Sequence, residues 1–229
     1  MVTAIAHRGD PEGQRENTLA AFDAAVRQGA DMVELDLRRT ADGSIVVLHD
    51  ETLERLWGVP ARVDELTVTE VRAVTDGDDR IPTLAEALRH VELPVMVDFT
   101  GPEVVEGALL EVRQADAVER CLFVTDHVDA LRQLRSAAPE VRIGLTWLGH
   151  QPPPPALTDE LDASYWNPWF PLLDPASVDE LHERGLAVST WTVDEVADIE
   201  AVLALGVDAV VTNRIGRLRS MLDSTRPDE

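Results

Sequence analysis

The feature that most constrains the fold of this chain is a regular alternation of short apolar runs with segments of helical period. The apolar runs predict strands at Thr3–Ala6, Met32–Leu37, Ile45–Leu48, Val95–Phe99, Cys121–Thr125, Arg142–Thr146, Ala163–Trp166, Leu186–Thr190 and Ala209–Thr212. The segments between them predict helices at Leu19–Gln28, Leu84–His90, Glu103–Gln114, Val128–Ala138, Pro175–Glu183, Val193–Leu205 and Arg214–Leu222. This alternation is typical of parallel strands joined by crossover helices.

The length of 229 residues is close to the roughly 250 of a (β/α)8 barrel. We therefore expect an α/β fold, a single TIM barrel, with one domain covering residues 1–229. Nine predicted strands exceed eight by one. The dipeptide Asp42-Gly43 indicates a turn, so we expect Ile45–Leu48 to lie beside the second barrel strand. The proline-rich stretch from Gln151 to Pro155 is interpreted as a stiff surface loop.

The chain carries 43 acidic residues against 20 basic ones, giving a formal net charge of -23, and all the basic residues are arginine. Such a charge repels nucleic acid and anionic membrane surfaces, so we expect neither as a partner. We interpret the excess of acidic residues as a solvated surface. By itself it indicates no particular reaction. The expected partner is a small molecule.

Little in the sequence points to an oxidising compartment or a membrane. The single cysteine, Cys121, lies in an apolar run and predicts a core residue. The first residues lack the features of a signal peptide, and no run reaches the ~20 apolar residues of a membrane helix. We expect a cytoplasmic protein without stable membrane insertion, whose oligomeric state is not determined by the sequence.

Ionisable residues recur at the carboxyl ends of the predicted strands, where a barrel gathers its catalytic groups. Glu34 and Asp36 are two apart in the second strand, so they point to the same face. Two carboxylates in an apolar interior need compensation, either by a hard divalent cation, Mg²⁺ or Ca²⁺, or by an arginine such as Arg8 or Arg38. The pair alone leaves both interpretations open.

Two histidines also follow apolar runs. His7 and His49 are candidates for acid/base roles because imidazole titrates near neutral pH, although a histidine at a strand end is often only a hydrogen-bonded rim residue. Asp50 either orients an imidazole or caps a helix that begins near Glu51. Arg8 offers a guanidinium suited to bidentate phosphate contact.

The second half of the chain holds four tryptophans, which are mainly expected in the core. Trp191 differs from the others because it directly follows a predicted strand. It either packs in the core or forms a wall of the pocket, where it would contact substrate.

Seven short motifs resemble, in order and spacing, the signatures of the glycerophosphodiester phosphodiesterase family. They are His7-Arg8-Gly9, Glu16-Asn17-Thr18, Glu34-Leu35-Asp36, Asp42-Gly43, the run from His49 to Arg55, Ile81-Pro82-Thr83-Leu84 and Trp191-Thr192-Val193. The resemblance covers nearly the whole chain. It implies a barrel phosphodiesterase that hydrolyses glycerophosphodiesters to an alcohol and glycerol 3-phosphate.

The resemblance also implies roles for particular residues. Glu34 and Asp36 are then ligands of the divalent cation, His7 and His49 are the acid/base pair, and Arg8 binds phosphate. The family's insertion after the His-Asp motif is shortened here, since only about thirty residues separate that motif from Ile81.

Two departures from the family pattern matter. Where the family has Glu-x-Lys, this chain reads Asp98-Phe99-Thr100. Asp98 remains a candidate third metal ligand, but Thr100 cannot replace a phosphate-binding lysine, and Arg38 is the candidate for partial compensation. The second departure is Asn213, which stands where an aspartate is common.

Three functions therefore remain open. The first is glycerophosphodiester hydrolysis. The second is a related reaction, either on a lysophospholipid or forming a cyclic phosphate. The third, suggested by Thr100, is a degenerate barrel that binds a phosphorylated ligand without turning it over.

Overall fold

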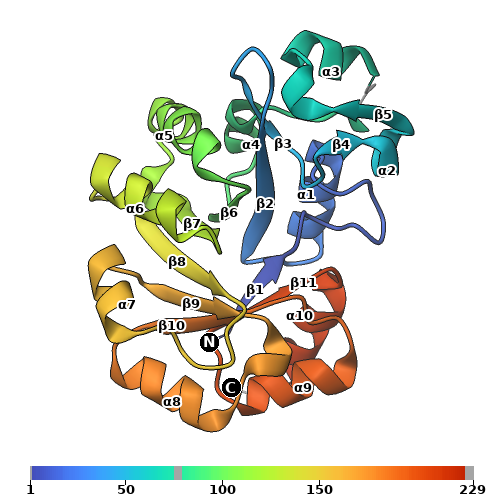
Figure 1. Ribbon diagram of the computed structural model, residues 1–229. Coiled ribbons are helices and arrows are strands. Elements are labelled where there is room, and N and C mark those ends of the chain that lie inside the picture. Colours follow the sequence, from blue (N-terminus) through green and yellow to red (C-terminus); the bar gives the residue numbers. More distant parts are fainter. Residues whose placement is uncertain (1, 75–78, 225–229) are drawn as a thin grey trace.

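Eight parallel strands close into a barrel in the computed structural model, which describes residues 2–74 and 79–224 (Figure 1). The barrel strands are β1 (Thr3–Ala6), β2 (Met32–Arg39), β6 (Val95–Phe99), β7 (Cys121–Thr125), β8 (Arg142–Trp147), β9 (Tyr165–Pro168), β10 (Ala187–Thr190) and β11 (Ala209–Thr212). Each pairs with the next, and β1 closes the ring by pairing with both β2 and β11. The predicted (β/α)8 barrel is confirmed.

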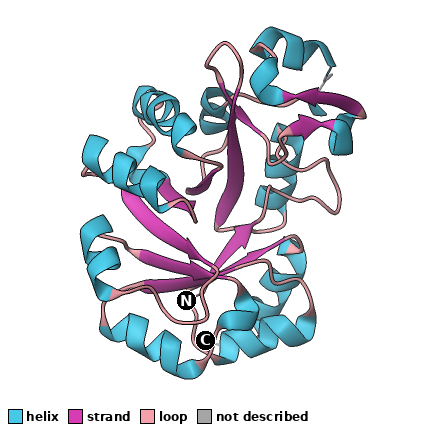
Figure 2. Ribbon diagram, in the orientation of Figure 1, coloured by secondary structure: helices cyan, strands magenta, loops and turns pink. Residues whose placement is uncertain are grey.

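Helices surround the strands on the outside, as Figure 2 shows. They are α1 (Leu19–Arg27), α4 (Leu84–His90), α5 (Val105–Gln114), α6 (Val128–Ala137), α7 (Pro155–Leu161), α8 (Pro175–Glu183), α9 (Val196–Ala204) and α10 (Ile215–Ser224), with short 3-10 turns at Pro102–Val104, Val118–Arg120 and Phe170–Leu172. Within the described residues, none of these helices is both long and apolar enough to cross a membrane.

The core has two layers because alternate strand residues face opposite sides of the barrel wall. The larger layer lies between the strands and the helices and includes Cys121, which is buried as predicted. A smaller cluster, including Ile5, Met96, Leu122 and Val211, also gathers buried strand residues. Met96 and Val211 of this smaller cluster line the cavity of the candidate site.

The extra predicted strand, Ile45–Leu48, lies beside the second barrel strand, as the turn at Asp42-Gly43 predicts. β3 (Ile45–Val47) runs antiparallel to β2, with Leu37 opposite Val47 and Arg39 opposite Ile45. The hairpin carries β2 beyond the rim of the barrel and then returns the chain, so that the amide of Leu48 donates to the carbonyl of Asp36. This return brings the residue that follows, His49, back to the rim.

A small excursion follows β3 and was not predicted in detail. It contains β4 (Thr52–Leu53), α2 (Glu54–Trp57), β5 (Val59–Arg62), a 3-10 turn at Val63–Glu65 and α3 (Val68–Val74). Its buried residues form their own apolar cluster around Leu48 and Leu53. Apart from α3, which has seven residues, these elements have two to four residues and are too short to show a period in the sequence.

Several helix and strand ends differ from the sequence prediction by one to three residues, and α7 was not predicted. Pro155, expected at the end of a loop, begins α7, because a proline at the first position of a helix loses no hydrogen bond. The strand expected at Ala163–Trp166 lies two residues later, because β9 spans Tyr165–Pro168. The shift brings Asn167 into the strand, beside Thr146 of β8.

Candidate active site at the mouth of the barrel

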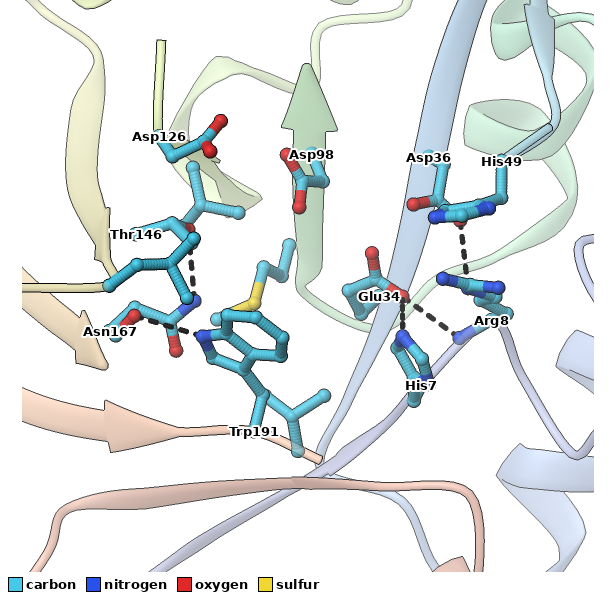
Figure 3. Close-up of a pocket in the computed structure, with 14 residues that line it drawn as sticks. His7, Arg8, Glu34, Asp36, His49, Asp98, Asp126, Thr146, Asn167 and Trp191 are labelled. Atoms are coloured by element: carbon cyan, nitrogen blue, oxygen red, sulfur yellow. Dashed lines mark hydrogen bonds and ion pairs between the residues drawn. The ribbon is translucent and has the colours of Figure 1, made fainter. Parts of the chain in front are cut away.

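A cavity of about 200 Å³ opens at the carboxyl ends of the barrel strands. Figure 3 shows its lining as sticks. The lining residues are His7, Arg8, Glu34, Asp36, His49, Met96, Asp98, Val124, Asp126, Thr146, Leu148, Asn167, Trp191 and Val211. The sequence analysis gave catalytic, metal-binding or substrate-binding roles to eight residues. Seven of them line this cavity, and the eighth, Arg38, does not.

Three carboxylates meet on one side of this cavity. Glu34 and Asp36 share one face of β2, and the register between β2 and β6 sets Asp36 directly opposite Asp98. One oxygen of each carboxylate lies within 4.8 Å of the others. Neighbouring parallel strands hold the three groups together because their alternation is in phase.

The crowding of these carboxylates changes their protonation. Burial raises the pKa of Glu34 well above its ordinary value, and the charge of Asp36 raises it further. Burial likewise raises the pKa of Asp98, with smaller contributions from Asp36 and Asp126. Charged oxygens so close together call for a cation, and an all-oxygen donor set suits a hard divalent ion.

Arg8 compensates part of this charge but not all of it. Its Nε atom lies 3.1 Å from Oδ2 of Asp36, and its backbone amide donates to Oε2 of Glu34 over 2.9 Å. Asn17 donates a further hydrogen bond to Asp36, at 2.7 Å. Among the described residues, no basic side-chain nitrogen lies within 4.0 Å of the carboxylate of Asp98. The donor set therefore fits a cation better than a purely arginine-paired cluster.

The loop that carries Arg8 is held against the first helix by close packing. Gly9 has a φ of +85°, and a Cβ added there would lie 2.6 Å from the carbonyl carbon of Ala21. Both the positive φ and the close approach of Ala21 therefore require glycine at this position. The Nη1 atom of Arg8 donates to Glu16 over 2.9 Å, so both ends of the guanidinium are fixed.

His7 follows β1 and is held from behind by a hydrogen-bonded chain. Its Nδ1 lies 2.8 Å from Oδ1 of Asn213, and the amide group of Asn213 donates to Asp194 over 2.8 Å. Its Nε2 lies 3.9 Å from Oε2 of Glu34. Burial, followed by the nearby positive charge of Arg8, lowers the pKa of His7. The ring is thus fixed with Nε2 toward the carboxylates.

His49 follows β3 and lies on the same side of the cavity as His7 and Arg8 (Figure 3). Its Nδ1 lies 2.8 Å from Oδ1 of Asp50. A hydrogen bond from Arg55 lowers the pKa of Asp50 to about 2, so this carboxylate stays charged. The following helix begins at Glu54 without a side-chain cap, so Asp50 orients the imidazole and does not cap a helix.

Trp191 forms a wall of the cavity, one of the two positions expected for it. Its Nε1 donates to the carbonyl of Asn167 over 3.0 Å. Asn167 is itself fixed, because its amide donates to Thr146 and its oxygen accepts from Ser189. The indole ring is therefore held by a buried polar network.

Arg38 and Thr100 lie outside the cavity. The guanidinium of Arg38 donates two hydrogen bonds, of 2.9 and 2.6 Å, to the carbonyl oxygen of His49, and Thr100 donates to the carbonyl of Leu37 over 2.7 Å. Both line a separate surface hollow. Arg38 lies two residues after Asp36 and on the same face of β2. At Arg38, however, β2 already extends beyond the barrel rim and pairs with β3 of the hairpin. The expected compensation of Thr100 by Arg38 is therefore not supported by its position.

Sequence reasoning missed several residues of the lining. The sequence places Asp126 where it could cap the helix predicted at Val128–Ala138, and it was not assigned a site role; α6 in fact begins after His127 without a side-chain cap. Since Asp126 directly follows β7, the rule that sites gather at strand ends would have included it. Thr146 and Asn167 gave no such signal, because they are polar but not ionisable and lie within strands.

Fold and site together define a barrel enzyme whose chemistry lies at the carboxyl ends of its strands. A model of the glycerophosphoryl diester phosphodiesterase family matches residues 7–217. The chain belongs to this family. It is accordingly a phosphoric diester hydrolase of the glycerophosphodiester phosphodiesterase class.

Individual relatives agree in sequence and in structure. A glycerophosphodiester phosphodiesterase from Caldanaerobacter subterraneus subsp. tengcongensis is 30% identical, over 91% of this chain and 93% of its own length. A crystal structure of a putative glycerophosphoryl diester phosphodiesterase from Silicibacter pomeroyi superposes with a TM-score of 0.89, at 26% identity, covering 98% of this chain and 94% of that one.

A third relative carries a ligand. An Oleispira antarctica phosphodiesterase, solved in complex with the product sn-glycerol-3-phosphate, superposes with a TM-score of 0.87 at 22% identity, covering 96% of each chain. At this identity the similarity shows a common fold.

Proposed function

We propose that this cavity hydrolyses glycerophosphodiesters to an alcohol and glycerol 3-phosphate, with a divalent cation, Mg²⁺ or Ca²⁺, held by Glu34, Asp36 and Asp98. The observation that carries the proposal is the cluster of three carboxylates within 4.8 Å, with two imidazoles at the same cavity. The product bound to the Oleispira antarctica relative agrees with a small phosphorylated ligand. A substrate of this kind also suits a cavity of about 200 Å³.

The phosphate group is held between the cation site and Arg8. When bound, a divalent cation supplies Lewis-acid neutralisation of the charge on a phosphoryl oxygen. Arg8 binds a second oxygen, and its guanidinium is already oriented by Glu16 and Asp36. Preorganised positive charge of this kind stabilises the transition state because it needs no rearrangement during the reaction.

The two histidines move the protons. One removes a proton from the nucleophile as its oxygen bonds to phosphorus. The other donates a proton to the alcohol oxygen as the bond from phosphorus to that oxygen breaks. Attack by water gives glycerol 3-phosphate directly, whereas attack by the neighbouring glycerol hydroxyl gives a cyclic phosphate that water must then open. His7 and His49 each have Nδ1 engaged, with Asn213 and Asp50 respectively, so Nε2 is the atom that exchanges the proton.

The test is hydrolysis of a glycerophosphodiester by the wild type and by His7→Ala, each with and without a chelator. We expect the chelator to abolish activity, Mg²⁺ or Ca²⁺ to restore it, and His7→Ala to lower it by about 10²-fold or more. His90→Ala is the matched control, because His90 lies on α4, is not part of the cavity lining, and pairs through Nε2 with Asp23. Activity indifferent to both the chelator and His7→Ala would defeat the assigned site.

Phosphorus NMR of the products separates this reaction from its relatives. A signal from glycerol 3-phosphate alone supports direct hydrolysis. A cyclic phosphate that accumulates would show that the glycerol hydroxyl is the nucleophile and that the product is released without hydrolysis.

A further inference from the structure

The labelled basic groups of the cavity lie on one side of it. Arg8, His7 and His49 are there beside Glu34 and Asp36, whereas Asp126, Thr146 and Asn167 lie on the other side, with Trp191 between them (Figure 3). Since Arg8 and the two histidines occupy the first side, the second side is free to contact the part of the substrate that changes from one diester to another.

Asp126 supplies a carboxylate on this second side, and within the described residues no arginine pairs with it. Among residues 2–74 and 79–224, the only basic side-chain atom within 4.0 Å of its carboxylate is Nε2 of His127, at 3.7 Å. Both side chains are about half exposed, at 52% and 51%. By contrast, the acidic groups Glu16 and Asp50 at the other rim are both bound to Arg55.

A carboxylate in this position can discriminate between substrates by their charge. Every glycerophosphodiester brings one negative charge on its phosphate, which Asp126 repels at short range. An alcohol that is itself positively charged reverses that interaction, because an ammonium group then lies between the phosphate and the carboxylate. A neutral alcohol leaves the repulsion in place.

Trp191 strengthens the same preference. Its ring is held by the hydrogen bond from Nε1 to Asn167, so its position in the cavity is fixed. An indole face attracts an ammonium or alkylammonium group. Leu148, which is 56% exposed at the rim, adds an apolar surface for N-methyl groups.

We propose that Asp126, together with Trp191, makes this enzyme selective for glycerophosphodiesters whose alcohol carries an ammonium group. The proposal rests on the hydrolysis proposed above and adds the class of the alcohol. Asp126 acts as a specificity determinant that contacts the leaving alcohol.

The test compares kcat/KM for the choline and ethanolamine esters of glycerophosphate with that for the uncharged glycerol ester. We expect the wild type to prefer the two cationic esters, and Asp126→Asn to lower kcat/KM on them by about tenfold while leaving the glycerol ester unchanged or faster. Asp129→Asn is the matched control, because Asp129 lies three residues further on and its side chain is 90% exposed. The preference should also weaken at high ionic strength.

Each other outcome has a distinct meaning. If the wild type hydrolyses all three esters equally, or Asp126→Asn lowers kcat/KM on all three by the same factor, the selectivity is overturned while hydrolysis stands. The second result would mean that Asp126 contacts the glycerol hydroxyls common to all three. If no ester is hydrolysed, the proposed function fails and this inference fails with it.

Discussion

The Nδ1 atom of His7 lies 2.8 Å from the Oδ1 atom of Asn213. The direction of this hydrogen bond follows from the next residue, Asp194, whose carboxylate accepts from the Asn213 amide group over 2.8 Å. A charged carboxylate only accepts, so the Asn213 oxygen must face His7, and Nδ1 of His7 must carry the proton. Three residues therefore determine the tautomer of one imidazole.

Exchanging the two partners should shift the titration of His7. The double variant Asn213→Asp with Asp194→Asn keeps a hydrogen bond between the two positions but places a negative charge beside Nδ1. Because an adjacent negative charge favours the imidazolium, the pKa of His7 should rise by about one unit or more. The limb of the profile of kcat/KM against pH that belongs to His7 should then move to higher pH. Both limbs unmoved would contradict a role for Asn213 in positioning His7.

The stability of the cation-free protein should fall as the pH rises. Burial raises the pKa values of Glu34 and Asp98 above their ordinary values of 4.5 and 3.8. A raised folded-state pKa means that the folded chain binds protons more tightly than the unfolded chain. Stability is thus highest near or below these ordinary values, and it declines as the pH rises toward the folded-state pKa values.

Thermal unfolding in chelator, followed from pH 5 to pH 8, measures this decline. Glu34→Gln should flatten it, since glutamine does not titrate, and added divalent cation should remove it in the wild type. The lowered pKa of Asp50, about 2, has the opposite effect on stability. The stabilisation that charged Asp50 provides is lost only as the pH falls below this range. Stability that rises across the range would contradict the crowding of the carboxylates.

Arg38 should affect turnover more than substrate binding. Its two hydrogen bonds to the carbonyl of His49 fix the segment that carries this imidazole. We expect Arg38→Met to lower kcat by about tenfold, through misplacement of His49, and to change KM less than twofold. Arg39→Met, one residue further along β2, provides the comparison. A large rise in KM with unchanged kcat would instead show that Arg38 binds phosphate.

Gly9 should tolerate alanine far less well than Gly185. Both have positive φ, +85° and +77°, but only at Gly9 would a Cβ meet backbone atoms, whereas the space at Gly185 is open to 4 Å. Gly185→Ala should cost about 1 kcal/mol of unfolding free energy from the backbone alone. Gly9→Ala should cost about 3 kcal/mol or more, because α1 must also move. Urea unfolding of both variants measures the difference, and equal costs would disprove the close approach.

The barrel was predictable because its strands are buried runs of characteristic length, and the turn at Asp42-Gly43 accounted for the extra strand. The carboxylates were predictable for a related reason: alternation along one strand brings Glu34 and Asp36 to one face, and adjacent strands stay in phase. The position of Arg38 depends on where β2 crosses the rim, which alternation does not reveal. Asp126 was overlooked because one residue satisfied both a cap pattern and a strand-end pattern, and only the geometry separated them.

The excursion between His49 and Ile81 lies outside the barrel, so a change in its length would not affect all residues of the candidate site equally. The three carboxylates lie on barrel strands and His7 directly follows one, whereas His49 follows β3 of the hairpin outside the ring. The side chains of His7 and His49 are 17% and 46% exposed. Lengthening or shortening the excursion would therefore displace His49 while the barrel wall stayed in register. Longer excursions inserted at this point would change access to the cavity without altering His7 or the three carboxylates.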